Sequence, residues 1–330
     1  MEASAVSVRA LETPDVTVVI PTRDRLHYLK DAVASVLAQV DVSVRCVVVD
    51  DGSTDGTSDW LRDLEDPRVR TISVSRSSER STARNAGLAA SRSGLVLFLD
   101  DDDVLARGAL STLAECLWRH PGSVVAIGRQ VQFTDDGRHW LEKHPVPRRP
   151  ADLRRCAMYG PVLPPGQCLL VTDVVRRVGG WDPRYQGPED QDLLLRIAEA
   201  GRGCFVPHVT YLKRVHPGNL GVGDDSVPAD RMRAEHVARL GSSHEGQVAA
   251  RRYEARRWLH ASYDSHGRGQ AFRGLLMAVR SLLRDPGLIF DPVTRGGTTR
   301  YLVHCLVRSV PGTYRVARAL GLTSSSGDAA

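Results

Sequence analysis

The sequence predicts an α/β fold in which a Rossmann-like, mostly parallel sheet is flanked by helices and followed by a helical C-terminal extension. Two observations predict it. Short apolar runs alternate with helical patterns over the first 120 residues, and no strand pattern follows residue 224. Such alternation is typical of right-handed βαβ units. We therefore expect an N-terminal extension over 1–14, a sheet domain over 15–224 and an arginine-rich helical region over 225–330.

The elements follow from hydrophobic periodicity and from turn residues. In the first part, strands are expected at 16–20, 45–49, 69–74 and 95–99, and helices at 26–39, 55–65, 81–91 and 106–120. The pattern then loosens into strands at 129–134, 168–172 and 209–215, a surface loop at 143–155, and a helix at 189–200 that ends at Gly201. Helices near 229–240, 245–265, 268–284 and 300–309 follow, and only 324–330 look disordered.

Composition limits the partners. Aromatic residues make up only 5% and do not alternate with arginine in the way that stacks bases, so nucleic acid is not an expected partner. The net charge of +5 is uneven, because residues 228–330 carry 16 arginines against 8 acidic residues. That excess suits a peripheral contact of the helices with anionic lipid, and equally suits solvated helix faces. A homo-oligomer through the C-terminal helices is a separate alternative.

Cysteine usage and hydropathy indicate a compartment. The six cysteines show no CxxC spacing and mostly fall in apolar stretches, as in the reduced core of a cytosolic protein. No signal-peptide pattern opens the chain, and no apolar run approaches the ~18 residues of a membrane span. We expect a cytoplasmic protein, with peripheral contact at the inner face of the membrane as an alternative.

Four consecutive aspartates, Asp100 to Asp103, follow the apolar run 94–99. A short apolar run indicates a buried strand, and open α/β sheets bind ligands beyond the carboxyl ends of their strands. Adjacent carboxylates repel one another, so the expected occupant is a hard divalent cation such as Mn²⁺ or Mg²⁺ that carries substrate phosphates. A solvated acidic turn is the alternative.

Other polar residues follow the early strands, where a parallel sheet brings them to the same edge. They are Pro21, Thr22 and Arg23 after the first strand, Asp50 and Asp51 after the second, and Arg84 and Asn85 near the start of a helix. The segment 51–55 is also ordinary turn and helix-capping chemistry. No single piece is specific, but their joint occurrence is.

Taken together, these pieces closely resemble the family 2 glycosyltransferases of the GT-A fold. The matching stretches are VVIPTR at 18–23, VVVDDGSTD at 47–55, ARNAG at 83–87, LFLDDDD at 97–103, GGWD at 179–182 and GPEDQDL at 187–193. They stand in the family's order and spacing across residues 16 to about 216, whereas the helical tail carries no assignable motif.

The resemblance implies a nucleoside-diphosphate sugar as donor. The residues implied in holding its base and ribose are Asp50 or Asp51 with Pro21, Thr22 and Arg23, and those implied near the nucleotide or its diphosphate are Arg84 and Asn85. The base-edge contacts suggest UDP and do not exclude TDP or GDP.

The resemblance also implies a metal site for Mn²⁺ or Mg²⁺. Asp100-x-Asp102 corresponds to the family's DxD element, which contacts ribose and metal, with Asp102 as the favoured direct ligand. Because Asp101 is also acidic, as is the residue after the motif, the choice of carboxylates stays open. His216 is a candidate third group, since a histidine near this point can complete the metal or diphosphate site in related enzymes; a structural or solvated histidine is the alternative. Lys213 and Arg214 are further candidates for the diphosphate.

The acidic pair Glu189–Asp190 opens a predicted helix just after Pro188. Acidic residues are ordinary in a first helical turn. In the family this pair supplies the base that deprotonates the acceptor hydroxyl, and Asp190 is favoured over Glu189. A carboxylate base suits a single displacement that inverts the anomeric carbon. Trp181 is either an apolar face for the acceptor or a core residue.

The expected function is therefore metal-dependent, inverting transfer of a sugar to a hydroxyl of a glycan, a lipid-linked intermediate or a small metabolite. A catalytically inactive nucleotide-sugar binding module is the non-enzyme alternative. A phosphatase of the haloacid dehalogenase type also uses Asp-x-Asp after a strand, but on the first strand. A dinucleotide-dependent dehydrogenase needs a glycine-rich turn where this chain has Pro21-Thr22-Arg23.

Overall fold

A computed structural model describes residues 13–74, 79–141, 153–154, 157, 163–217, 226–267 and 270–289. The chain divides into two compact units, Met1–Ala229 and Asp230–Ala330, which we describe separately. The predicted helix at 300–309, the disordered end at 324–330 and most of the predicted extension 1–14 and loop 143–155 lie outside the described residues. The domain limits drawn from the sequence stay a prediction.

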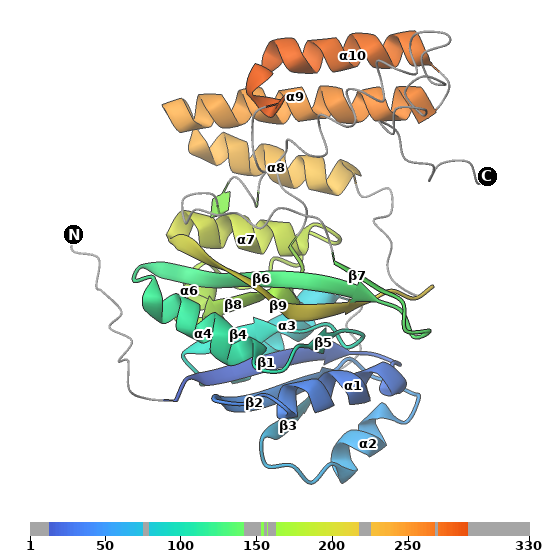
Figure 1. Cartoon of the computed structure of the whole chain (residues 1–330), viewed down its shortest axis with the longest axis vertical. Coiled ribbons are helices and arrows are strands. Elements are labelled where there is room, and N and C mark those ends of the chain that lie inside the picture. Colours follow the sequence, from blue (N-terminus) through green and yellow to red (C-terminus); the bar gives the residue numbers. More distant parts are fainter. Residues whose placement is uncertain are drawn as a thin grey trace. The chain divides into compact units, whose positions relative to one another are not determined.

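The first part of unit 1 is a parallel sheet with the strand order β3-β2-β1-β4 (Figure 1). Its strands are β1 (Asp15–Thr22), β2 (Ser43–Asp50), β3 (Val69–Ser73) and β4 (Leu95–Phe98). The connecting helices are α1 (Leu26–Leu37), α2 (Thr57–Asp63) and α3 (Arg80–Ala90). Because Thr22 pairs with Asp50 and Val19 with Phe98, the carboxyl ends of these strands share one edge.

The sheet continues with mixed strand directions. Strand β8 (Cys168–Val171) is antiparallel to β4 and to β6 (Ser123–Phe133), whereas β9 (Arg202–Arg214) runs parallel to β6. Two short strands, β5 (Val104–Leu105) and β7 (His139–Leu141), pair with β9 and β6. The helices here are α4 (Ala109–Arg119), α6 (Thr172–Arg177) and α7 (Glu189–Ala200), and a 3₁₀ turn, η2, spans Pro165–Gln167. The α/β fold class is thus confirmed, with its parallel part concentrated in the first four strands.

The core explains why the first strands read as continuous apolar runs. The consecutive residues Val18, Val19 and Ile20 of β1 are completely buried, because helices cover both faces of a parallel sheet. Helix α3 packs so closely on β1 that a Cβ added to Gly87 would lie 2.2 Å from Val19 Cγ1. This glycine therefore fixes the depth of α3, the helix that carries Arg84.

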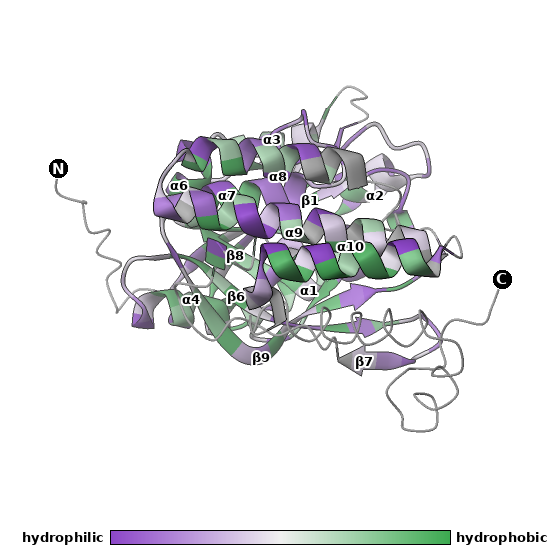
Figure 2. Cartoon of the chain, turned by 90° about the horizontal axis from the view of Figure 1, so that it is seen from above, coloured by the Kyte–Doolittle hydropathy of each residue, from purple (hydrophilic) through white to green (hydrophobic). Residues whose placement is uncertain are grey.

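Unit 2 contains most of α8 (Ser226–Leu240), together with α9 (His244–Gly267), α10 (Ala271–Arg284) and the 3₁₀ turn η3 (Pro286–Ile289). Helices α9 and α10 form an antiparallel hairpin, in which Ser262 Oγ donates to the Gly274 carbonyl and Arg284 pairs with Glu254. Both helices carry hydrophilic as well as hydrophobic residues along their length (Figure 2). Among the described residues, no helix combines the length and apolar character needed to cross a bilayer.

Candidate active site

The strand ends bring the predicted donor-side residues together at one edge of the sheet. Thr22, at the end of β1, donates its hydroxyl to Asp101 Oδ2 at 2.8 Å, and its carbonyl accepts the Asp51 backbone N–H at 3.0 Å. Pro21 precedes it within β1 and is half-buried. Arg23 lies 4.0 Å from Asp51 Oδ2. The tips of β1, β2 and β4 therefore form one continuous polar rim.

The two aspartates after β2 lie in different surroundings. Asp50 is 1% exposed, and its carboxylate accepts the Ser53 backbone N–H at 3.0 Å and the Ser58 hydroxyl. It therefore holds the turn into α2, as the capping interpretation predicts. The Asp51 side chain retains 11% exposure and lies toward Arg23. Of the pair, Asp51 is the one that faces the rim.

Asp102 lies at the centre of the acidic run. Its Oδ2 is 2.7 Å from an Arg25 nitrogen and 3.1 Å from His216 Nε2, so the predicted carboxylate and histidine are brought together. Arg25 also reaches Asp101 at 3.2 Å. Burial raises the pKa of Asp101 to about 6, and the nearby Arg25 guanidinium only partly offsets it.

Asp103 has a structural role. Tyr211 donates its hydroxyl to one oxygen, and the Arg214 backbone N–H donates to the other at 2.8 Å. Burial, followed by repulsion from Asp102 and Asp100, raises the pKa of Asp103 well above its usual range. Both oxygens of Asp103 thus accept hydrogen bonds from β9, and this distinguishes Asp103 from the other three aspartates of the run.

The acidic run fits a divalent cation. Oxygens of Asp100, Asp102 and Asp103 lie within 4.8 Å of one another, and carboxylate oxygens are the ligands that Mn²⁺ and Mg²⁺ prefer. With Asp103 bonded to β9, Asp100 and Asp102 remain as the carboxylates of the set, and the His216 ring lies beside Asp102. Burial is the main cause of the raised pKa values of Asp101 and Asp103, and repulsion from Asp102 and Asp100 adds to it; a cation would relieve that repulsion.

Arg84 connects the acidic run to the second acidic pair. Its buried guanidinium lies 2.7 Å from Asp100 Oδ1, 3.5 Å from Glu189 Oε1 and 3.4 Å from Asp190 Oδ1. The same guanidinium carbon lies 4.3 Å from the centre of the Trp181 ring. Burial raises the pKa of Asp100, but Arg84 outweighs it and holds that pKa below the ordinary value.

The acidic pair at the start of α7 is asymmetric. Glu189 is 2% exposed, and its Oε1 also lies 3.2 Å from Arg80. The Asp190 side chain is 19% exposed. Burial raises the pKa of Asp190 to about 7; Arg84 opposes the rise, and the charges of Glu189 and Asp100 add to it. Asp190 is therefore the more accessible carboxylate, and its pKa is that of a base active near neutrality.

Asn85 fixes the segment that carries Trp181. Its Oδ1 accepts the Trp181 backbone N–H and its Nδ2 donates to the Trp181 carbonyl, both at 2.8 Å. Gly180 precedes it with a φ of +67°, and a Cβ there would lie 2.6 Å from Asn85 Oδ1. Asn85 therefore positions a tryptophan, and its side chain does not point at the metal cluster.

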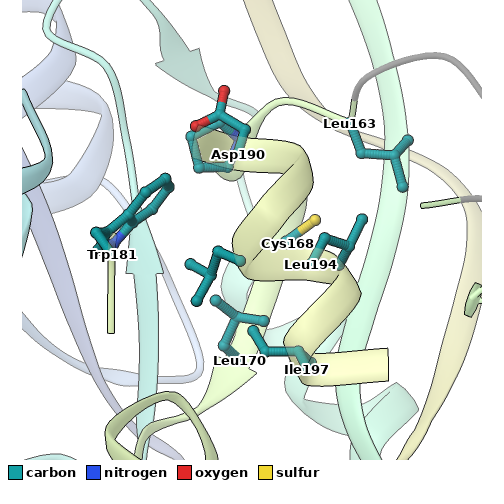
Figure 3. A pocket seen from close by; sticks show the side chains of 9 residues that line it. Leu163, Cys168, Leu170, Trp181, Asp190, Leu194 and Ile197 are labelled. Atoms are coloured by element: carbon teal, nitrogen blue, oxygen red, sulfur yellow. The ribbon is translucent and has the colours of Figure 1, made fainter. Parts of the chain in front are cut away.

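Trp181 borders an apolar pocket beside Asp190. The ring is 1% exposed and packs edge-on against Phe98 at 5.1 Å. Figure 3 shows the ring and Asp190 at the margins of this pocket, with leucines of α7 forming one wall. The remaining lining residues are Leu163, Pro165, Cys168, Leu170, Leu193, Leu194 and Ile197. Trp181 is therefore a core residue whose ring also lines this pocket, and its acceptor-side role stays a prediction.

The two basic candidates before His216 differ. Arg214 is buried, donates to Asp31 Oδ2 at 2.8 Å and to Asp135, and stacks on Phe133. These contacts connect the end of β9 to α1, which carries Asp31, and to the end of β6, which carries Phe133. Lys213 is half-buried, and its charge helps to lower the pKa of Asp100.

Sequence reasoning missed two arginines of the site. Arg25 binds Asp101 and Asp102, and Arg80 binds Glu189. Arg25 lies just before α1, and Arg80 is the first residue of α3. The available signal was positional: each arginine directly precedes a predicted helix, 26–39 or 81–91, at the edge of the sheet where the carboxylates lie.

Comparison with known proteins agrees with this geometry. The family model described as glycosyl transferase family 2 matches residues 17–179. The succinoglycan biosynthesis protein ExoO of Rhizobium meliloti is 38% identical over 127 residues, which is 38% of this chain and 36% of that protein. The alignments with ExoO and other curated relatives span between 17% and 40% of those proteins' own lengths.

Solved structures show the same fold. TarS residues 1–349 of S. aureus, in complex with UDP-GlcNAc, gives a TM-score of 0.62 at 16% identity and covers 93% of this chain and 92% of that one. The mannosyltransferase PcManGT of Pyrobaculum calidifontis, in complex with GDP-Man and Mn²⁺, gives 0.57 at 19% identity, covering 91% and 88%. With this architecture and the match over 17–179, the chain belongs to glycosyl transferase family 2 and has the GT-A fold.

Proposed function

We propose that the protein transfers a sugar from a nucleoside-diphosphate donor to an acceptor hydroxyl, in a metal-dependent reaction that inverts the anomeric carbon. One observation carries the proposal: the Arg84 guanidinium lies 2.7 Å from Asp100 and 3.4 Å from Asp190. The candidate donor-side and acceptor-side carboxylates therefore belong to one site.

The donor nucleotide would lie along the rim formed by the β1 and β2 tips. Asp51 would accept hydrogen bonds from the base edge or ribose, with Arg23 beside it, while Asp50 would hold the turn. We propose UDP as the nucleotide. Because TarS was solved with UDP-GlcNAc and PcManGT with GDP-Man, GDP is the first competitor to compare, followed by TDP.

Asp100, Asp102 and His216 would hold Mn²⁺ or Mg²⁺. When bound, the ion supplies positive charge that stabilises the departing nucleoside diphosphate. The protein's own part is orientation: Arg25 holds the Asp102 carboxylate at 2.7 Å, and Arg84 holds Asp100 at 2.7 Å. Both carboxylates are thereby fixed before any ligand arrives.

Asp190 would be the base. The acceptor hydroxyl gives its proton to the Asp190 carboxylate, its oxygen attacks the anomeric carbon, and the bond from that carbon to the diphosphate oxygen breaks on the opposite face. A single displacement of this kind inverts configuration. Glu189 would act as a buried counter-charge for Arg80 and Arg84. The acceptor would be a hydroxyl of a glycan, a lipid-linked intermediate or a small metabolite, approaching past Trp181.

Of the alternatives, the inactive binding module is the one to test. The phosphatase interpretation is not favoured, because the aspartate run follows β4 and not the first strand of the sheet. The binding module has no such difficulty, since a nucleotide-sugar can bind at the same rim without turnover.

A nucleotide panel tests the donor site. Thermal unfolding is measured with UDP, GDP and TDP, each with and without Mn²⁺. We expect stabilisation by UDP that requires the metal, because the carboxylates and the diphosphate share the ion. No response to any nucleotide would contradict the proposal.

Donor hydrolysis and transfer then separate enzyme from binding module. Asp190→Asn should lose turnover by about 10²-fold or more while nucleotide affinity stays unchanged. Asp63→Asn, at the exposed end of α2, is the matched control. A wild-type protein that binds UDP but transfers sugar to no acceptor and hydrolyses no donor supports the binding module instead.

A further inference from the structure

Helix α10 carries an exposed apolar stripe. Phe272 is 80% exposed, Leu276 46%, Val279 43% and Leu283 77%. Their spacing of four, three and four residues places them on one face of the helix. They are four of the six large hydrophobic side chains found exposed in the described part of the chain. We call these four residues the α10 stripe.

The opposite face of α10 packs on α9. Ala278 and Ser281 are buried, and the Gly274 carbonyl accepts the Ser262 hydroxyl at 2.6 Å. Small residues on this face let the two helices approach closely. The α10 stripe therefore lies on the side of α10 opposite to the small residues that face α9.

One flank of the stripe is basic. Arg273, Arg280 and Arg284 follow one another along the same side of α10, and all three are exposed. Two of them are anchored to α9: Arg280 lies 5.3 Å above the Trp258 ring, and Arg284 pairs with Glu254. Helix α10 itself contains no acidic residue. A row of cations thus runs beside the apolar row, between it and α9.

We propose that this face of α10 docks unit 2 on the surface of an anionic lipid bilayer. The α10 stripe would enter the boundary between headgroups and acyl chains, and the arginines would meet lipid phosphates at the level of the headgroups. The helix would lie in the membrane plane, since it has the apolar face and basic flank of an interfacial helix.

Charge favours lipid over a second copy of the chain as the occupant. A self-complementary contact through α10 would bring basic flanks together with no acidic residue on either α10, while Glu254 of α9 already pairs with Arg284. A bilayer containing anionic lipid supplies the missing negative charge. Vesicle binding and sugar transfer are measured separately, so this proposal and the enzymatic one stand or fall independently.

The test uses the full chain with two kinds of vesicle, one of phosphatidylcholine alone and one containing phosphatidylglycerol. Co-sedimentation should be strong only with the anionic vesicles and should fall as salt rises. Phe272→Ser with Leu283→Ser should weaken binding at least about tenfold, because both side chains leave water on docking. Arg273→Ser should weaken it about fivefold.

Two matched controls change the same kinds of side chain elsewhere. Trp140→Ser removes an exposed apolar residue on β7, and Arg62→Ser removes an exposed arginine on α2. Both should bind vesicles like the wild type. Thermal unfolding of every variant checks that the helical unit is intact.

Three results would overturn the proposal. The first is that the wild type fails to bind anionic vesicles. The second is that the stripe variant binds as well as the wild type. The third is that the stripe variant changes the oligomeric state in solution with no loss of vesicle binding, which would assign the stripe to a second copy.

Discussion

Asp100 and Asp190 share the guanidinium of Arg84, although they follow a strand and open a helix that are far apart in sequence. The shared cation allows two carboxylates of opposite proposed roles to lie near one another in a buried site. It also divides them. Arg84 lowers the pKa of Asp100 below its usual value, whereas burial raises that of Asp190 to about 7. Different pKa values for neighbouring carboxylates are how such sites assign ligand and base.

Replacing Arg84 should damage both stability and activity. Arg84→Met leaves Glu189, which is 2% exposed, without its inner partner, and should cost about 3–5 kcal/mol in the free energy of unfolding. Arg84→Lys keeps the charge but loses the planar fork, so its loss should be smaller. Denaturant unfolding measures both, and Arg62→Met on the exposed face of α2 is the control. Equal stability of the three variants would contradict the role given to Arg84.

The rate of sugar transfer should depend on pH through Asp190. A base works only when deprotonated, so kcat/KM should fall as pH drops through about 7, the raised pKa of this carboxyl. The cause is burial, followed by Arg84, which opposes it, so Arg84→Met should move the acidic limb to higher pH. A pH–rate profile of both proteins checks the direction. An acidic limb near the ordinary aspartate pKa would argue against Asp190 as the base.

The same pKa has a consequence for stability. A carboxyl whose pKa is raised by folding stays protonated in the folded protein while the same carboxyl ionises in the unfolded chain. The free energy of unfolding therefore falls as pH rises from about 4 to about 7. Asp190→Asn mimics the neutral form. Its stability relative to the wild type should therefore increase over this range and then level off, which denaturant unfolding at several pH values measures. A difference that stays constant with pH would show that Asp190 does not titrate in this way.

Two neighbouring aspartates should respond differently to substitution. Asp102→Asn should weaken Mn²⁺ binding at least about tenfold with little change in unfolding, because its partners are Arg25 and His216 at the site. Asp103→Asn should mainly lower stability, because Asp103 holds Tyr211 and the backbone of β9. Calorimetric Mn²⁺ titration and thermal unfolding give the two readouts. The reverse pattern would exchange the assignments.

Packing at Gly87 should be intolerant of a single methyl group. Gly87→Ala places a carbon 2.2 Å from Val19 Cγ1, so α3 must move, at a cost of about 1–3 kcal/mol. Gly94→Ala is the matched control, since a Cβ there meets nothing within 4 Å. Adding Val19→Ala should recover part of the loss. Unfolding measurements on the three variants decide it, and a harmless Gly87→Ala would mean that α3 is less tightly fixed than its contacts indicate.

The sequence predicted the parallel part of the sheet well because the signal there is local. Each buried strand is a continuous apolar run, and each is followed by a polar turn. The longer strands were less predictable. Strand β9 was expected from 209 but begins at Arg202, and β6 was expected from 129 but begins at Ser123. Pro207 interrupts the apolar pattern, and the β6–β9 pairing shifts register there, so the extension depends on tertiary pairing.

The site was predictable in its residue types but less so in its contacts. The positions of Thr22, Asp101 and Asp102 after apolar runs were enough to predict that they lie at one edge of the sheet. The partner of each carboxylate depends on the direction of its side chain, which the sequence does not give. Asp103 accepts a hydrogen bond from β9, whereas its neighbour Asp102 pairs with Arg25. Its position before a predicted helix could have placed Arg25 at this edge, but the carboxylates that it binds could not be read from spacing, since they follow a different strand.

The contact of Gly87 with Val19 matters for attempts to alter substrate range. It sets how deeply the helix that carries Arg84 packs on a central strand, and the nearest atoms at this contact all belong to Val19. Exchanging the turn at 51–56 should consequently leave Arg84 in place. The same exchange should disturb Arg25, because Asp55 of that turn accepts the Leu26 backbone N–H at the start of α1.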